Sequence, residues 1–181
     1  MPSVCVYLGA RAGDGEQWAN AAREAGRSIA ELGHTLVYGG GRLGLMGILA
    51  DAALDAGGDV VGVIPTSMVE REQAHPGLRE NHIVPDMHAR KLKLTELADA
   101  FLILPGGFGT MDELFEAITW RQLDIHQKPI GLWSVDGYYD GLWQFLQRGR
   151  GLGFMPEATF GSLRIAPELS PLLGALAPAA G

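Results

Sequence analysis

Cysteine and charge are both scarce in this sequence. Of its 181 residues, one is a cysteine and 19% are charged. A single cysteine, Cys5, allows neither a disulfide framework nor a cysteine metal cluster, and its place in an apolar run predicts a buried core residue. The five histidines show no spacing typical of metal ligands. We therefore expect no metal site.

Positive charge is the scarcer of the two signs. The chain has 14 lysines and arginines against 21 aspartates and glutamates, which gives a net charge of −7 at pH 7. Proteins that bind duplex nucleic acid present a basic surface, so nucleic acid is not an expected partner. Any phosphate site must then depend on backbone N–H groups and a few local cations.

Long apolar runs are also missing. The longest are far shorter than the roughly 20 residues of a membrane span, so no membrane partner is expected. Met1, Pro2 and Ser3 lead directly into the first apolar run, without the pattern of a secretory signal. We therefore expect a cytoplasmic protein.

What is present is an alternation of strand and helix patterns, over a length that suits one domain, residues 1–181. Strands are predicted at 4–8, 35–38, 60–64, 82–84, 100–104, 129–133 and 163–166. Helices are predicted at 16–32, 45–56, 87–97, around Glu113, at 138–148 and at 167–176. Residues 66–80 are expected to be irregular, with a short helix or a lid as the alternatives, and the tail from about 177 is expected to be frayed. Such alternation predicts an α/β fold whose mainly parallel sheet is covered by helices on both faces.

The most informative stretch runs from Pro105 to Glu113 and reads Pro-Gly-Gly-Phe-Gly-Thr-Met-Asp-Glu. Glycines between a strand and a helix let the backbone approach a ligand closely, and the helix N-terminus offers unpaired N–H groups that suit a phosphate. Glu113 lies one turn into the helix, so the pattern indicates chemistry on a nucleotide or a sugar phosphate. Alternatively, Thr110 and Glu113 form a capping box that only stabilises the helix start.

A second glycine loop, from Gly39 to Gly44, reads Gly-Gly-Gly-Arg-Leu-Gly and matches the G-x-G-x-x-G pattern of dinucleotide sites. The acid that would bind the ribose is missing, because the next predicted strand ends in Pro65 and Thr66, and Asp59 precedes it. We therefore favour a mononucleotide held between the two glycine loops over an NAD site. The remaining alternative is that these glycines only form tight turns.

A basic pair, Arg90 and Lys91, lies in the predicted helix that precedes the Pro105 loop. The start of this helix can lie at the same sheet edge as the loop. The pair is then either part of the site or a solvated helix face.

Four motifs carry a family resemblance. They are Y-G-G-G at 38–41, G-L-M-G at 44–47, M-x-x-R-K at 87–91 and P-G-G-x-G-T-x-x-E at 105–113. Together they resemble the Lonely guy family of cytokinin-activating phosphoribohydrolases, whose members were long mislabelled as lysine decarboxylases. The resemblance extends over nearly the whole chain.

The resemblance implies a Rossmann-like, doubly wound domain that forms a homodimer. It implies hydrolysis of the N-glycosidic bond of N6-substituted adenosine 5′-monophosphates to a free base and ribose 5-phosphate, with no cofactor. The family's catalytic residues fall on Arg90 and Glu113. We expect Glu113 to stabilise charge on the ribose, and Arg90 to clamp the substrate or to orient Glu113 through a bidentate pair. Substrate and phosphate binding is expected at Gly40, Gly41, Gly44, Met87, Lys91, Gly106, Gly107, Gly109 and Thr110.

Two departures from the family pattern concern the substrate. Gly9, Ala10 and Arg11 stand where Gly-Ser-Ser is common, so a cation replaces a hydroxyl. Asp112 and Glu113 stand where a Glu-Glu pair is frequent, so the expected catalytic residue, Glu113, is unchanged. Two other functions stay open: a salvage nucleosidase that acts on plain purine or pyrimidine monophosphates, and a non-catalytic carrier of a nucleotide or of the molybdenum cofactor.

Apolar side chains on two predicted helices suggest the homodimer independently. Ile118, Trp120 and Leu123 form one stripe, and Leu92 and Leu94 lie on the other helix. More apolar side chains than one sheet face needs would leave a patch for a partner. The alternative is that they are all buried within one chain.

Overall fold

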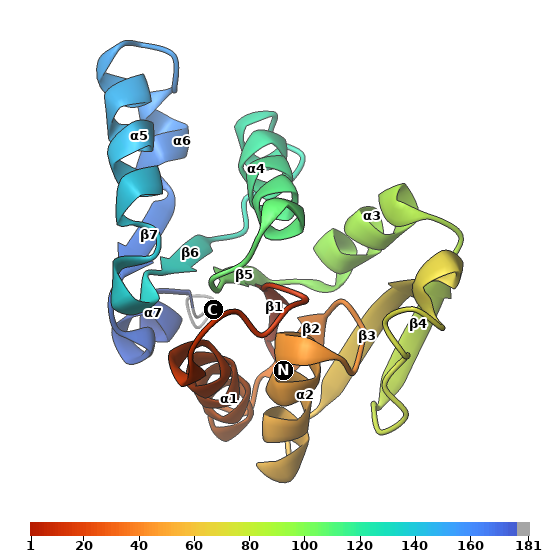
Figure 1. Ribbon diagram of the computed structural model, residues 1–181. Helices are drawn as coiled ribbons and strands as arrows, with labels where there is room; N and C mark the ends of the chain where they lie inside the picture. Colours follow the sequence, from red (N-terminus) through yellow and green to blue (C-terminus); the bar gives the residue numbers. More distant parts are fainter. Residues whose placement is uncertain (177–181) are drawn as a thin grey trace.

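Seven short strands form one fully parallel sheet in the computed structural model, which describes residues 1–176 (Figure 1). In chain order they are β1 (Ser3–Tyr7), β2 (Thr35–Tyr38), β3 (Val60–Pro65), β4 (Glu80–Val84), β5 (Ala100–Ile103), β6 (Ile130–Trp133) and β7 (Leu163–Ala166). Their spatial order is β4-β3-β2-β1-β5-β6-β7. In the centre of the sheet, Val4 pairs with Leu36 on one side and with Ala100 on the other. The predicted parallel sheet is confirmed.

Helices cover both faces of the sheet, as predicted (Figure 1). One face carries α1 (Glu16–Glu31), α2 (Gly44–Asp55) and α7 (Leu169–Leu176). The other carries α3 (Met87–Leu97), α4 (Phe108–Gln122), α5 (Asp140–Gly151) and α6 (Glu157–Gly161). Because strand side chains alternate, Val4 and Val6 join the first core while Cys5 and Tyr7 join the second. Cys5 is fully buried, as expected.

Most elements lie close to their predicted positions. The strands at 35–38 and 163–166 and the helix at 87–97 have the predicted bounds. Two short elements escape the sequence pattern, because so few residues show no periodicity: α6 and the 3-10 helix Val135–Gly137. The short helix expected as one possibility within 66–80 is the 3-10 helix Thr66–Met68. The frayed tail predicted from 177 lies outside the described residues. No helix within residues 1–176 is long and apolar enough to cross a bilayer.

The order of the strands creates a crevice beside β1. The chain runs outward from β1 through β2 and β3 to β4, and then returns to the other side of β1 as β5. In open parallel sheets, ligands bind at the carboxyl ends of the strands where the order reverses in this way. The loops after β1 and β5 touch there, since the Gly9 N–H donates to the carbonyl of Pro105 at 3.1 Å.

Candidate active site

A cavity of about 810 Å³ lies at this reversal point. Its walls come from the loop after β1, the loop after β5 with the start of α4, and the segment between β3 and β4. Both predicted catalytic residues, Arg90 and Glu113, line it, and so does Met87. The fold thus brings Met87 and Arg90 of the motif at 87–91 together with the loop and helix start at 105–113.

The N-terminus of α4 is open toward the cavity. The helix begins at Phe108, Gly107 is its N-cap, and no side chain within residues 1–176 caps it. The N–H groups of Phe108, Gly109 and Thr110 therefore have no acceptor within the helix, and all three residues line the cavity. A Cβ on Gly107 or Gly109 would meet no atom within 4 Å. Such an exposed helix start binds anions.

The alternative of a capping box is wrong. Thr110 is the third residue of α4 rather than its N-cap, so the Thr-x-x-Glu spacing does not span the helix start. Thr110 is buried and packs beneath Gly106, where an added Cβ would overlap with its hydroxyl. Glu113 lies in the second turn of α4 and is not used to cap it.

Glu113 is a carboxyl group without a hydrogen bond or an ion pair among residues 1–176, and it lines the cavity. Burial raises its pKa from 4.5 to about 7, and Asp112 and Glu72 act in the same direction. The positive charges of Arg90 and Lys91 oppose this rise. A cavity carboxyl that titrates near pH 7 has the properties of a catalytic base.

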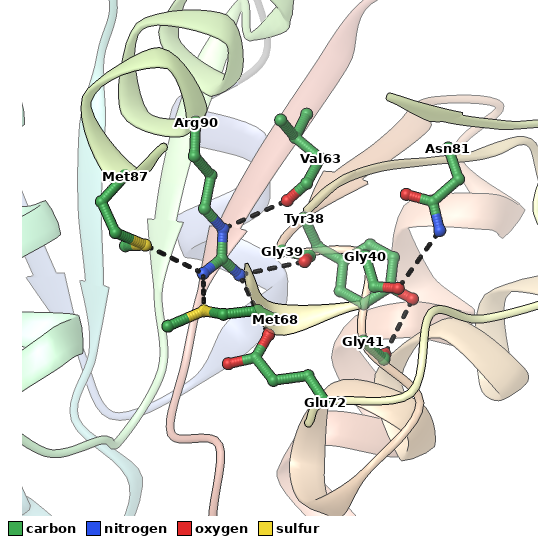
Figure 2. Close-up of polar contacts among 10 residues, drawn as sticks. All are labelled: Tyr38, Gly39, Gly40, Gly41, Val63, Met68, Glu72, Asn81, Met87 and Arg90. Carbon is green, nitrogen blue, oxygen red and sulfur yellow. Dashed lines mark hydrogen bonds and ion pairs between the residues drawn. The ribbon is translucent and has the colours of Figure 1, made fainter. Parts of the chain in front are cut away.

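Arg90 is 5% exposed, and its Nη1 faces the sulfur atoms of Met68 at 3.6 Å and of Met87 at 3.9 Å (Figure 2). Its Nε donates to the carbonyl of Val63 at 3.1 Å, and its Nη2 donates to the carbonyl of Gly39 at 2.9 Å. Nη2 also lies 3.6 Å from Oε2 of Glu72. Arg90 therefore fastens α3 to β3 and to the end of β2. The predicted bidentate pair with Glu113 is not formed among the described residues.

Met68 and Glu72 line the cavity beside Arg90, although neither is among the site residues predicted from the sequence. Figure 2 shows both side chains close to the guanidinium. They belong to an irregular segment that folds back across the sheet edge, where Ala74 bridges to Gly41. The sequence has no signal for them, because the segment has no periodic pattern and only this fold-back brings it to the site.

Lys91 is not among the cavity-lining residues. Its Nζ lies 2.9 Å from Oδ2 of Asp112 and 3.0 Å from Oε2 of Glu116. The ammonium group thus joins α3 to α4. This geometry does not support the expected phosphate contact of Lys91, because two carboxylates already hold its charge.

The first glycine loop lines the cavity only through Gly39. The other glycines with an expected role in phosphate binding lie outside the cavity wall: Gly40, Gly41 and Gly44. They instead let protein atoms approach. A Cβ on Gly40 would lie 2.8 Å from Oδ1 of Asn81, and one on Gly44 would overlap with the carbonyl of Ala10. The phosphate role predicted for Gly40, Gly41 and Gly44 stays a prediction, while the glycine loop that lies open in the cavity wall is the one after β5.

Two further parts of the wall come from the loop after β1 and from the turn before α5. Arg11 and Asp14 reach the cavity because β1 lies beside β5. The hydroxyl of Tyr138 donates to the carbonyl of Gly106 at 2.6 Å, and its ring meets Trp18 edge-on. The rule that ligands bind at the carboxyl ends of parallel strands would point to the β1 loop. In the sequence, Tyr138 belongs to the Asp-Gly-Tyr-Tyr stretch at 136–139, which is part of the family resemblance but carries no predicted role in the site.

The amino-acid sequence matches a known family model and is similar to named enzymes. The family model described as "Possible lysine decarboxylase" matches residues 46–175. The chain is 47% identical over 152 residues to a probable cytokinin riboside 5′-monophosphate phosphoribohydrolase of Oryza sativa subsp. japonica, with 84% of this chain covered. It is 45% identical over 175 residues to the cytokinin riboside 5′-monophosphate phosphoribohydrolase of Rhodococcoides fascians, with 96% of this chain and 88% of that protein covered.

The chain is shorter than some of these relatives, since it spans 68% and 64% of two rice proteins that it matches. Among solved structures, the Moco carrier protein from Chlamydomonas reinhardtii is similar to it with a TM-score of 0.72. The two are 22% identical, and the match covers 96% of this chain and 94% of that one. At this identity the similarity shows the Rossmann-like α/β fold.

Proposed function

This chain belongs to the family described as possible lysine decarboxylases, which also holds the cytokinin riboside 5′-monophosphate phosphoribohydrolases, and we propose that it has the same activity. It hydrolyses the N-glycosidic bond of N6-substituted adenosine 5′-monophosphates and releases the free base and ribose 5-phosphate. The observation that carries the proposal is the position of Glu113 in the same cavity as the open N-terminus of α4.

The proposed chemistry depends on the carboxylate. Water attacks C1′ of the ribose, the C1′–N9 bond breaks, and the base leaves with the bonding electrons and takes up a proton. Positive charge develops on the ribose during this step, and the carboxylate of Glu113 stabilises it. The same carboxylate accepts a proton from the water, for which a pKa of about 7 is well suited. The N–H groups of α4 bind the 5′-phosphate and so hold the ribose beside Glu113.

Arg90 supports Glu113 through its charge rather than through direct contact. Its guanidinium opposes the rise in the pKa of Glu113 and keeps more of the carboxyl ionised at neutral pH. An arginine cannot act as the base, because it stays protonated. The hydrogen bonds to Gly39 and Val63 keep this positive charge in place.

Incubation of the protein with AMP and with isopentenyladenosine monophosphate tests the proposal. We expect equal amounts of free base and ribose 5-phosphate, formed faster from the N6-substituted nucleotide. Faster release from AMP and from other plain nucleotides would favour the salvage nucleosidase. No release from any nucleotide would overturn the hydrolase and favour the carrier.

The proposal also requires the 5′-phosphate. Binding energy at a remote phosphate can lower the barrier at C1′, so we expect kcat/KM for adenosine to be at least about a hundredfold below that for AMP. Measurement of base release from both compounds checks this ratio. Similar efficiencies would show that the phosphate does not bind at the start of α4.

We further propose that the protein is a homodimer that associates through α3 and α4. These helices are joined by the ion pairs of Lys91. These helices and the residue that follows α4 expose large apolar side chains: Leu92 by 50%, Phe115 by 38% and Leu123 by 61%. Leu94 and Ile118, which the sequence suggests for the same patch, pack into the core instead.

Sedimentation at micromolar concentration should give twice the 19.3 kDa of one chain, and a fully active species of 19.3 kDa would contradict the dimer.

A further inference from the structure

The cavity is lined by more acidic than basic side chains. The acidic ones are Asp14, Glu72, Asp112 and Glu113, and the basic ones are Arg11 and Arg90. A phosphate monoester carries a charge of about −1.5 to −2 at pH 7. Backbone N–H groups alone would have to bind this anion against the field of the acidic groups. The cavity therefore needs a cation that is free to contact the phosphate.

Arg90 is not free for this role. Its Nε and Nη2 donate to the carbonyls of Val63 and Gly39, its Nη1 faces the sulfur atoms of Met68 and Met87, and its charge lies beside Glu72. Turning it toward a ligand would leave two carbonyls and a carboxylate without their partner, which is unfavourable in a buried site. Lys91 lies outside the cavity wall and is held by two carboxylates.

Arg11 meets the requirement. It lines the cavity, it is exposed, and it has no hydrogen bond or ion pair with any other residue that the structure describes. Its loop lies against the open glycine loop, because the Gly9 N–H donates to Pro105 and a Cβ on Gly9 would lie 3.2 Å from Cα of Gly106. Arg11 is thus two residues from the point where the two loops touch.

We propose that Arg11 binds the 5′-phosphate of the substrate together with the N–H groups of α4, and that it contributes to the preference for phosphorylated nucleosides. The proposed function supplies the identity of the substrate on which this inference rests. A planar guanidinium forms two parallel hydrogen bonds to phosphate oxygens, which fixes the orientation of the phosphate as well as its position. Because Arg11 has no partner to give up, this contact does not disturb the fold.

Calorimetric titration with inorganic phosphate and with ribose 5-phosphate tests the inference without turnover. The variants are Arg11→Ala and Arg11→Lys. Arg71→Ala is the matched control, because Arg71 is exposed beside Glu72, lies outside the cavity wall and has no polar partner among residues 1–176. We expect Arg11→Ala to weaken the binding of both ligands at least about tenfold, the lysine variant to recover part of this, and the control to bind normally.

Kinetics complete the test. In Arg11→Ala the KM for AMP should rise by the same factor as the dissociation constant of ribose 5-phosphate, while kcat/KM for adenosine and the melting temperature stay unchanged. Unchanged phosphate binding in Arg11→Ala would overturn the inference, and so would an equal loss in Arg71→Ala. If the wild type binds ribose 5-phosphate through Arg11 but releases no base, the proposed function fails and the inference on Arg11 stands. If base is released and Arg11→Ala keeps its KM for AMP, the inference on Arg11 fails and the proposed function stands.

Discussion

The two glycine loops have similar sequences but opposite roles in the structure. In the first, Gly40 and Gly44 have positive φ angles of 76° and 58°, and a side chain on Gly44 would overlap with the carbonyl of Ala10. In the second, Gly107 and Gly109 have no neighbour within 4 Å of an added Cβ. Glycine in the first loop makes room for protein atoms, whereas glycine in the second leaves room for a ligand.

The helices that follow the two loops differ in the same way. After the first loop, α2 lines the cavity with the apolar Leu45 and Met46. After the second, α4 lines it with Asp112 and Glu113. A glycine-rich turn between a strand and a helix is therefore not enough to identify an anion site. The packing around the turn decides whether its N–H groups can reach a ligand.

The largest effect is expected from Glu113→Gln, which removes the carboxylate that distinguishes the second loop. Base release should fall at least about a thousandfold, because the amide neither stabilises the ribose cation nor accepts a proton. Turnover of the nucleotide measures the loss. The matched control is Glu116→Gln on the same helix, which lies outside the cavity wall and should keep its activity. Near wild-type turnover in Glu113→Gln would leave this residue without a catalytic role.

The glycine comparison itself is tested by Gly44→Ala and Gly107→Ala. The first places a side chain at positive φ against a carbonyl, so the free energy of unfolding should fall by about 2 to 4 kcal/mol. The second has φ −92° and open space, so its stability should change by less than about 0.5 kcal/mol, while its KM for AMP rises because the methyl group occupies ligand space. Urea unfolding measures the stability of the two variants, and steady-state kinetics measure their KM for AMP. Equal destabilisation by the two substitutions would refute the distinction between the loops.

The charge state of Glu113 should also affect stability. Its folded pKa of about 7 lies above the ordinary 4.5, so ionisation of this buried group destabilises the fold progressively between these values and fully above pH 7. Glu113→Gln should therefore raise the free energy of unfolding by up to about 3 kcal/mol at pH 8, and by almost nothing at pH 4. Thermal unfolding at both pH values checks the difference. A gain that is independent of pH would contradict this account of Glu113.

The smallest effect is expected from the loss of the hydrogen bond that joins Tyr138 to the second glycine loop. Tyr138→Phe removes the hydrogen bond to the carbonyl of Gly106, so we expect KM for AMP to rise about two- to fivefold with kcat unchanged. Tyr139→Phe is the matched control. Its hydroxyl donates to the buried carbonyl of Leu104, so its loss should lower stability by about 1 kcal/mol and leave KM unchanged. The same KM in Tyr138→Phe and the wild type would show that the loop holds its shape without this bond.

The elements that could be predicted have local causes. The helix at 87–97 begins where Asp86 accepts a hydrogen bond from the N–H of Ala89 at 2.9 Å, a start signal contained in four residues. The open loop and Glu113 could also be predicted, because they follow one another along the chain. The roles of Gly44 and Lys91 could not, because they depend on partners that other segments supply.

By itself, the sequence determined the alternation of strands and helices, the buried strand before the second glycine loop and the placement of Glu113 one turn behind it. Only the tertiary structure decided that Arg11, Glu72 and Tyr138 surround the same cavity. The physical reason is that Arg11 reaches the site because β1 lies beside β5, Tyr138 because β6 lies on the other side of β5, and Glu72 through the fold-back of the segment after β3. Contacts between segments so far apart along the chain leave no periodic pattern in the sequence, and they form only when the sheet assembles.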